Sequence, residues 1–344
     1  MKRLLARLRF ARLWLRRLKP VLLHPVWLAL GTIAVVVALF AVGTPVLDRI
    51  ELNWLDLRFR TRGPIAPKPT VVLAAIDEKS MQVEGRWPWP RSKIAALVDA
   101  LSRDGAKVIA FDVTFSEPDE NSRLKLVDQL AQKVDSLHVG SPGLAELIRE
   151  SRADADNDRI LARALERSKA AIVLGYFFHM SEAEVGYKLN QTGIGRQLQG
   201  IADSKYPMVL YADRSATSVP LMKAYAPQGN LAMFTAAAPS SGYFTVATDP
   251  DGVVRWMPLV IQDGDDLFPP LSVLSVWHYL GKPALAVRVR EEGVEGVQIG
   301  DRLVPTDELG QMLINYRGPA RTFPHYSISD ILGGKLPPGT FADK

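Results

Sequence analysis

Apolar residues are unevenly distributed along the chain, which contains one long uncharged run and a series of shorter segments with mixed periodicity. The long run covers residues 26–47, VWLALGTIAVVVALFAVGTPVL, and contains no charged side chain. As an α-helix it would be ~33 Å long at ~1.5 Å per residue, which is enough to cross the hydrocarbon core of a bilayer. The pattern therefore predicts a transmembrane helix over 26–47.

The apolar spacing changes directly after this run. Residues 48–62, DRIELNWLDLRFRTR, place Ile50, Trp54 and other apolar side chains at helical spacing among charged ones, which is typical of an amphipathic helix. Residues 63–69, GPIAPKP, contain three prolines, which fix φ and lack amide donors. We therefore predict a stalk helix and linker over 48–69, with a separate domain beginning after it.

Within that domain, residues 70–344, the densest structural signals lie between Ile76 and Asp119. Residues 70–76, TVVLAAI, form a short apolar run without alternation, which predicts a strand covered on both faces, as in a parallel sheet. An amphipathic helix is predicted over 91–103, followed by a second buried strand over 107–111. Because the connection is short, we expect a right-handed crossover between two parallel strands.

Further elements follow along the chain. They are a polar insertion lying over one face (121–152), a helix (154–168), a buried strand (170–178), two alternating strands joined by a turn at 249–252 (242–260), a helix (271–280), a strand pair (284–290 and 297–304) and an apolar strand (310–316). The predicted fold class is α/β, with an N-terminal transmembrane helix and a domain that combines a partly parallel sheet with added β-hairpins.

Charge assigns an orientation to this arrangement. Residues 1–19 hold eight basic side chains and no acidic one, and removing these eight from the net charge of +5 leaves −3 for the remainder. The alkaline pI thus comes from a short head, which argues against a nucleic-acid-binding surface. By the positive-inside rule, we expect the basic head, residues 1–25, to be cytoplasmic and the domain after the helix to be extracytoplasmic.

Two features of the N-terminus have more than one interpretation. The apolar run is longer than that of most secretory signals and no A-x-A cleavage site follows it, which favours an uncleaved anchor over a cleaved signal. The head either lies on anionic lipid as an interfacial helix or is a solvated orientation signal. The expected location is the plasma (inner) membrane, crossed once by this chain.

Candidate chemistry is sparse. The chain has no cysteine, and its five histidines show no ligand spacing, so no cofactor is expected. Asp77 ends the first strand, where it either caps the next helix or faces a ligand. Asp112 ends the second strand and would lie at the same sheet edge. It belongs to an acidic loop for which the simpler interpretation is exposure to solvent, and the alternative is binding of a hard cation. Neither a DxDxDG nor a DxD pattern is present, so no metal site is predicted.

Four ordered segments carry a family resemblance. They are AIDEKSMQVEGRWPWPR (75–91), AFDVTFSEPD (110–119), DPDGVVRWMPLV (249–260) followed by LFPPLSV (267–273), and PTDELGQMLINYRGPARTFPHYSISDIL (305–332). Together they resemble the type-two CHASE domain, the extracytoplasmic sensor of bacterial membrane receptors, over about Leu55 to Lys344.

The resemblance implies an N-terminal span before the sensor, return spans after it, and a cytoplasmic output. That output is a class III adenylate or guanylate cyclase, a histidine kinase or a serine/threonine kinase. Sensors of this family usually end on a Lys-Ile-Val-Leu-Val-Gly strand, of which this chain contains only the first lysine, Lys344. The chain is therefore expected to be a fragment or a truncated product, incomplete at its C-terminus.

The resemblance also indicates which residues matter. The candidate ligand-binding or sensing residues are Asp77, Arg91, Asp112, Ser116 and Arg255, and the structural signature residues are Trp87, Pro88, Trp89, Pro90 and Phe115. The tryptophans and prolines either pack a rigid turn against the sheet or contact a ligand. Arg91 and Asp112 either form an internal ion pair or recognise a small molecule, because a bidentate guanidinium serves both purposes.

Three functions remain in competition. The chain is predicted to be a membrane-anchored sensory input domain that binds a small-molecule or envelope ligand. It is expected to function as a homodimer and not to bind nucleic acid. The second hypothesis is an extracytoplasmic hydrolase that uses Asp77 and Asp112, although no G-x-S-x-G or H-E-x-x-H motif is present and no catalytic residue is predicted. The third is a structural or assembly subunit of an envelope complex.

Overall fold

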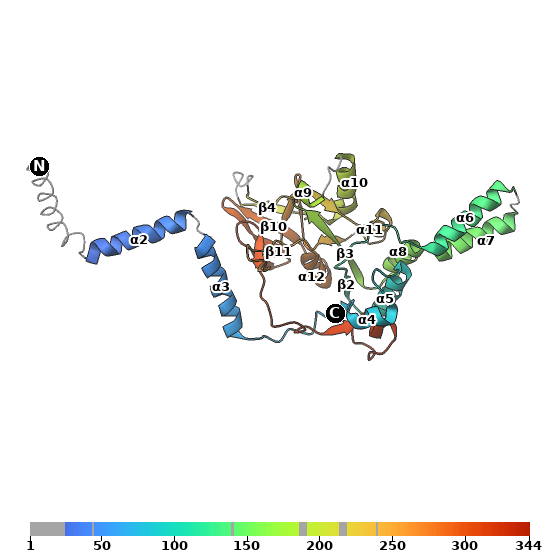
Figure 1. The fold of residues 1–344 in the computed structure, drawn as a ribbon, viewed down its shortest axis with the longest axis horizontal. Coiled ribbons are helices and arrows are strands. Elements are labelled where there is room, and N and C mark those ends of the chain that lie inside the picture. Colours follow the sequence, from blue (N-terminus) through green and yellow to red (C-terminus); the bar gives the residue numbers. More distant parts are fainter. Residues whose placement is uncertain (1–24, 43–44, 139–140, 186–190, 213–218, 239) are drawn as a thin grey trace, which may run out of the picture. The chain divides into compact units, whose positions relative to one another are not determined.

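The computed structural model describes residues 25–42, 45–138, 141–185, 191–212, 219–238 and 240–344 (Figure 1). The chain divides into two compact units, Met1–Ile65 and Ala66–Lys344.

The described part of unit 1 contains two helices, α2 (Pro25–Val42) and α3 (Pro45–Arg62). The predicted stalk thus begins three residues earlier than expected, and the predicted transmembrane segment 26–47 includes the start of α3. None of the helices within the described residues is long and apolar enough to span a membrane. The membrane helix therefore stays a prediction. Residues 1–24 of the predicted basic head lie outside the described residues.

Unit 2 combines helices with short strands. Its helices are α4 (Glu78–Glu84), α5 (Arg91–Arg103), α6 (Ser122–Ser136), α7 (Pro142–Ala155), α8 (Asn157–Arg167), α9 (Glu182–Val185), α10 (Gln191–Ile201), α11 (Ala232–Ala237), α12 (Leu271–Tyr279) and α13 (Ile328–Leu332). Its strands are β1 (Leu73–Ala75), β2 (Val108–Ala110), β3 (Ala171–His179), β4 (Val209–Tyr211), β5 (Ala226–Gln228), β6 (Ser241–Tyr243), β7 (Trp256–Pro258), β8 (Ile261–Asp263), β9 (Asp266–Phe268), β10 (Leu285–Arg290), β11 (Gly293–Ile299), β12 (Arg302–Pro305), β13 (Gln311–Leu313) and β14 (His325–Ser327). The predicted mixed α/β fold is confirmed.

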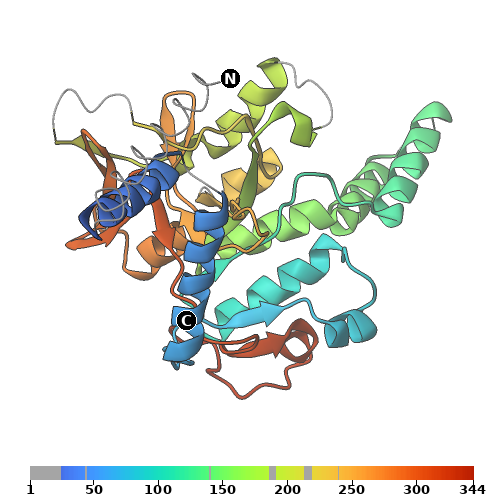
Figure 2. The ribbon, with the colours of Figure 1, turned by 60° about the vertical axis from the view of Figure 1, so that its left-hand side comes forward.

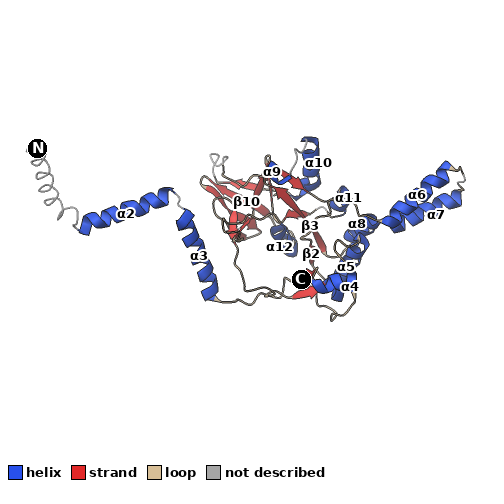
Figure 3. Ribbon diagram, in the orientation of Figure 1, coloured by secondary structure: helices blue, strands red, loops and turns tan. Residues whose placement is uncertain are grey.

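The strand β3 is the centre of a partly parallel sheet in which it pairs with β2, β5 and β6 (Figure 3). The pairings with β2 and β6 are parallel and the pairing with β5 is antiparallel. Gly175 lies at a close approach in this strand, because a Cβ there would be 2.1 Å from the carbonyl oxygen of Phe111. Only glycine therefore lets β3 pass the end of β2 at this spacing.

The pairing of β1 differs from the prediction. β1 pairs in parallel with β14, more than two hundred residues away in sequence, while β2 pairs with β3. The strand predicted to be covered on both faces is also partly open, since Leu73 is 44% exposed. An apolar run identifies a strand, but the choice of its neighbour depends on which distant segment packs beside it.

A second sheet includes the predicted strand pair 284–290 and 297–304, although the second range covers the end of β11 and the start of β12. It has the order β12–β11–β10–β4, in which β10, β11 and β12 form an antiparallel meander. The turn at 249–252 also forms, with the Gly252 amide donating to the Asp249 carbonyl at 2.8 Å and Gly252 at φ +81°. Its flanking strands do not pair with each other, however: β6 joins β3, and β7 pairs with β13. The turn signal was correct and the predicted hairpin was wrong.

The polar segment 121–152 was predicted to lie over one face. Instead, α6 and α7 pack against each other as an antiparallel hairpin that projects from the body of unit 2 near α8, as Figures 1 and 2 both show. Asn121 caps α6 by accepting hydrogen bonds from two main-chain amides of its first turn, and Ser141 caps α7 by accepting one from the Leu144 amide. These local caps make two helices from a segment that lacks the apolar content to cover a core.

The main hydrophobic core lies where α5 and α8 pack beside β2 and β3. On α5, a buried stripe of Ile94, Leu97, Val98 and Leu101 faces Leu161 and Leu165 of α8 within this core, as expected from the 3.6-residue period. The carboxyl end of β2 and the amino ends of both helices come together beside this core. That junction contains a polar network that includes Arg91, one of the predicted sensing residues.

Candidate functional site

The network begins at the first residue of α5. The preceding turn is held by Trp89, which is 2% exposed and donates from Nε1 to the Gly85 carbonyl at 2.7 Å. Trp87 packs edge-on against Trp89 with ring centroids 5.5 Å apart, whereas Pro88 and Pro90 are exposed. The two indoles contribute buried area, and Pro90 occupies the N-cap position directly before Arg91. The rigid turn thereby fixes where Arg91 enters the domain.

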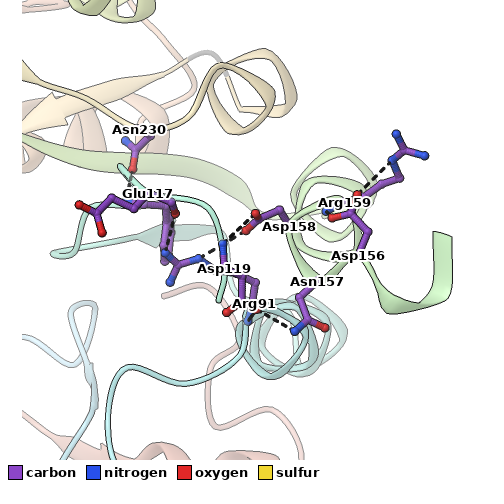
Figure 4. A network of polar contacts seen from close by, with 9 residues as sticks. Arg91, Glu117, Asp119, Asp156, Asn157, Asp158, Arg159 and Asn230 are labelled. Carbon is purple, nitrogen blue, oxygen red and sulfur yellow. Dashed lines mark hydrogen bonds and ion pairs between the residues drawn. The ribbon is translucent and has the colours of Figure 1, made fainter. Parts of the chain in front are cut away.

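Asp119 connects the loop after β2 to both helices (Figure 4). Its Oδ2 accepts a hydrogen bond from the Arg91 amide at 3.0 Å and another from Asn157 Nδ2 at 2.7 Å. Its own amide donates to Asp158 Oδ2 at 2.9 Å. The carboxylate therefore satisfies one of the unpaired amides at the start of α5, where the positive end of the helix dipole also favours negative charge.

The Arg91 side chain lies between this loop and α8. Its Cζ is 4.7 Å from the centroid of the Phe115 ring, and its Nη2 donates to the Glu117 carbonyl at 3.4 Å. Its Nε is 3.7 Å from Asp158 Oδ1, with both side chains nearly buried. Within the described residues, neither of these two atoms has a hydrogen-bond partner. The pair is thus close enough for electrostatic attraction but too far apart for a hydrogen bond.

Phe115 is fully buried and holds the loop in place. Its amide donates to Asn230 Oδ1 at 2.7 Å, and its carbonyl accepts from the Leu231 amide at 2.8 Å. Asn230 in turn donates from Nδ2 to the Gly175 carbonyl at 2.9 Å. One amide side chain therefore ties the loop after β2 to the central strand β3.

The electrostatics of the site centre on Asp158. Burial raises the pKa of this carboxyl, and the nearby carboxylates of Asp119 and Asp156 act in the same direction. The hydrogen bond from the Asp119 amide and the charge of Arg91 oppose the rise in pKa without cancelling it. A buried N–H donor and a carboxyl group with a raised pKa thus face each other without a shared hydrogen bond. This arrangement has the capacity to accept one further polar group or to respond to protonation.

The other predicted residues lie elsewhere. Asp77 caps α4, accepting from the Ser80 amide at 2.8 Å and from Ser327 Oγ at 2.7 Å. The hydrogen bond from Ser327 is the main reason that the pKa of Asp77 is lowered. Asp112 is exposed and Ser116 is half-buried. The ion pair of Arg91 is with Asp158 and not with Asp112, and Asp77 and Asp112 end strands of different sheets.

Arg255 belongs to a separate cluster at the turn 249–252. It is 3% exposed, and its Nη1 donates to Asp249 Oδ2 at 2.8 Å. It also binds Asp251 through both Nη atoms, at 2.9 Å to Oδ1 and 2.8 Å to Oδ2. Hydrogen bonding to Arg255 lowers the pKa of Asp251 to about 2. This guanidinium is engaged by two carboxylates of its own turn.

Sequence reasoning missed Asp119, Asn157, Asp158 and Asn230 as members of the site. The run ADADND, residues 153–158, was visible at the start of the predicted helix 154–168, but no contact with Arg91 was expected of its acids. Asn230 carries no sequence signal, since its role arises from a contact across more than a hundred residues. For a metal, no group of three or more potential ligand side chains occurs among the described residues.

Comparison with known proteins gives one match. A model of the CHASE2 domain matches residues 31–344, nearly the whole chain. No curated protein and no solved structure matches this sequence.

Proposed function

The chain belongs to the CHASE2 domain family, and on this basis we propose that it is the membrane-anchored extracytoplasmic input domain of a bacterial signal-transduction receptor. CHASE2 domains are extracellular sensory domains of signalling receptors. The family match over residues 31–344 is the observation that carries the proposal. It accounts for a chain that is dominated by one α/β unit.

Membrane anchoring is the first part of the proposal. It is supported by the uncharged run 26–47 and by the eight basic residues that precede it. The basic head is then cytoplasmic, and Ala66–Lys344 faces the periplasm or cell exterior. Anchor and stalk connect the sensor to the membrane, so that a change in sensor packing is transmitted to the output.

The Arg91 site is the proposed sensing element. Of the two arginines predicted to sense, Arg91 has a buried Nε–H that faces a carboxylate without hydrogen-bonding to it. A ligand carrying a carboxylate or phosphate would use that donor, because a guanidinium binds such groups with charge-assisted hydrogen bonds. The proposed output is a class III adenylate or guanylate cyclase, with a histidine or serine/threonine kinase as the alternative.

The membrane topology of the chain tests the proposal. Because the chain contains no cysteine, a single introduced cysteine is the only thiol that can react. A single cysteine at the exposed Arg103 is expected to react with a membrane-impermeant maleimide in intact spheroplasts. As a matched control, Lys2→Cys is expected to react only after permeabilisation. If Arg103→Cys requires permeabilisation as well, the extracytoplasmic sensor is excluded.

A structural subunit is the competing function. Cysteines placed one at a time along 48–62 separate it from a receptor: self-crosslinking at helical spacing supports a dimeric receptor, whereas crosslinking to another protein supports a scaffold.

A further inference from the structure

The α6–α7 hairpin projects from the body of unit 2 and exposes apolar side chains on one side, although the contact between its two helices is already filled. The two helices pack through a seam of half-buried residues at helical spacing: Leu124, Val127, Ala131 and Val134 from α6, and Leu144 and Ile148 from α7. The seam is therefore already filled within one chain. Four further leucines lie outside it and are exposed: Leu126 (57%), Leu130 (51%), Leu137 (70%) and Leu147 (58%).

These four residues form one surface, called here the leucine face. Leu126, Leu130 and Leu137 follow the spacing i, i+4, i+11, which places them on one side of α6, rotated by roughly 80–120° from the seam. Leu147 is rotated from the seam of α7 by roughly 70° at ~100° per residue, and the antiparallel arrangement turns it to the same side. Leu130 and Leu147 also lie level with each other, both ~12 Å from the base of the hairpin at ~1.5 Å per residue.

The opposite side of the hairpin is polar. There, Arg152 of α7 reaches Asp128 of α6 at 3.0 Å, and Gln132 and Ala145 are exposed. The two sides therefore differ in polarity: an ion pair joins the helices on one side, and exposed leucines lie on the other. An exposed apolar stripe of this kind on a projecting element marks an interaction surface.

Charges at the edges of the leucine face identify the partner. On α6 they are basic, Arg123 near the base and Lys133 farther out, whereas on α7 they are acidic, Glu150 and Asp154 near the base. Across the whole hairpin, α6 carries three basic and two acidic side chains and α7 carries two basic and three acidic ones. A surface that is basic on one helix and acidic on the other complements itself when α6 faces α7 of a second copy.

We propose that the leucine face is the interface through which two copies of this chain associate. A two-fold axis along the length of the hairpin stacks α6 on α7 of the second copy, which forms a four-helix bundle with both bodies at the same end. In this arrangement Leu130 lies opposite Leu147 of the second copy, and Arg123 lies opposite its Asp154. The proposed interface does not include the Arg91 site. Its test measures whether two chains associate, so its outcome is independent of whether Arg91 senses a ligand.

Crosslinking between two cysteine variants of the full chain in detergent micelles tests this register. Leu130→Cys and Leu147→Cys chains are mixed and oxidised, and a covalent dimer containing one chain of each kind is expected. The matched control is a mixture of Gln132→Cys and Ala145→Cys chains, which lie level with each other on the polar side. We expect at least a ten-fold lower yield of dimer there, and equal yields would overturn the proposal.

Charge reversal tests the partner. Arg123→Asp and Asp154→Arg are each expected to weaken self-association about two- to five-fold, as for an exposed ion pair, and together to restore it. Leu130→Glu is expected to give monomers by sedimentation, while Gln132→Glu leaves the dimer intact. Because these residues are exposed, circular dichroism is expected to be unchanged. A wild-type chain that is monomeric, or a double variant that fails to recover association, would contradict a second copy as the occupant.

Discussion

Arg91 and Arg255 are both nearly buried arginines in segments that carry the family resemblance, yet they are held in different ways. Arg255 makes three hydrogen bonds of 2.8–2.9 Å to Asp249 and Asp251 of its own turn. Arg91 stands 3.7 Å from Asp158, over the face of Phe115, and its Nε–H has no hydrogen-bond partner among the described residues. One guanidinium closes a local turn, whereas the other joins three segments distant in sequence.

We interpret this difference as a fold-stabilising role for Arg255 and the proposed sensing role for Arg91. A buried charge with close, well-directed partners stabilises the geometry around it, and removing it leaves carboxylates without their counter-charge. A buried charge with unused donor capacity adds less to stability but leaves a hydrogen bond for another group. We therefore expect Arg255 to dominate stability and Arg91 to dominate response.

The largest effect is expected from Arg255→Ala. Its loss leaves Asp249 and Asp251 facing an emptied site, which should cost about 3 kcal/mol of unfolding free energy. Urea unfolding followed by tryptophan fluorescence measures this. Arg290→Ala, which removes an exposed ion pair with Glu295, serves as the control and should cost no more than about 1 kcal/mol. A cost for Arg255→Ala as small as that of the control would remove the distinction between the two arginines.

Double-mutant cycles compare the two pairs directly. The coupling energy between Arg255 and Asp249 is expected to be about 2 kcal/mol, and that between Arg91 and Asp158 below about 1 kcal/mol, because only the first pair is hydrogen-bonded. Each cycle uses the glutamine variant of the arginine and the asparagine variant of the acid. Equal coupling would show that the 3.7 Å separation closes in solution and that Arg91 has no spare donor.

The pH dependence of stability is expected to have opposite signs at the two sites. Burial raises the pKa of Asp158, so the folded state binds its proton more tightly and the stabilisation from Asp158 is lost as pH rises through the raised pKa. The pKa of Asp251 is lowered to about 2, so its stabilisation is lost as pH falls from about 4 to about 2.

Melting temperatures of asparagine variants between pH 2.5 and 7 check these signs. Asp158→Asn is expected to flatten the profile above pH ~4, and Asp251→Asn to flatten it below pH ~4, because each removes one titrating group. An Asp158→Asn variant whose profile above this pH matches the wild type would contradict the assignment of a raised pKa.

The smallest effect is expected from Asp112→Asn. Asp112 is exposed, so the unfolding free energy should change by less than about 0.5 kcal/mol. In a chimeric receptor with a cyclase output, cyclic-nucleotide production by this variant should match the wild type, whereas Arg91→Lys should alter it. A loss of response in Asp112→Asn at unchanged stability would move the sensing site to the acidic loop.

Local elements were largely predictable from the sequence. The predicted helix over 91–103 coincides with α5, because an apolar stripe with a period of 3.6 residues and a terminal glycine are signals contained within the segment itself. The strand predicted over 170–178 matches β3 to within one residue. Long-range pairing was less accessible: β1 joins β14, and the strands beside the turn at 249–252 join different partners.

The site shows the same division. Arg91 was predicted as a sensing candidate from its motif, but Asp112, its partner in one of the two alternatives considered, is exposed. The actual partner, Asp158, lies on α8, which packs beside α5 through Leu161 and Leu165. Nothing in the local pattern distinguishes a capping acid from an acid that is also brought to a buried guanidinium.

By itself the sequence determined the types and bounds of the best-marked elements, the uncharged run with its basic head, and the motifs that resemble a sensor family. Periodicity, caps and turn residues act within a few neighbours, so they are visible in one chain of letters. The tertiary structure alone decided which strands pair, that 121–152 projects as a hairpin, and that Arg91 meets Asp158. Those outcomes depend on free energy gained when distant segments bury their apolar faces together, and that gain is not encoded at any single position.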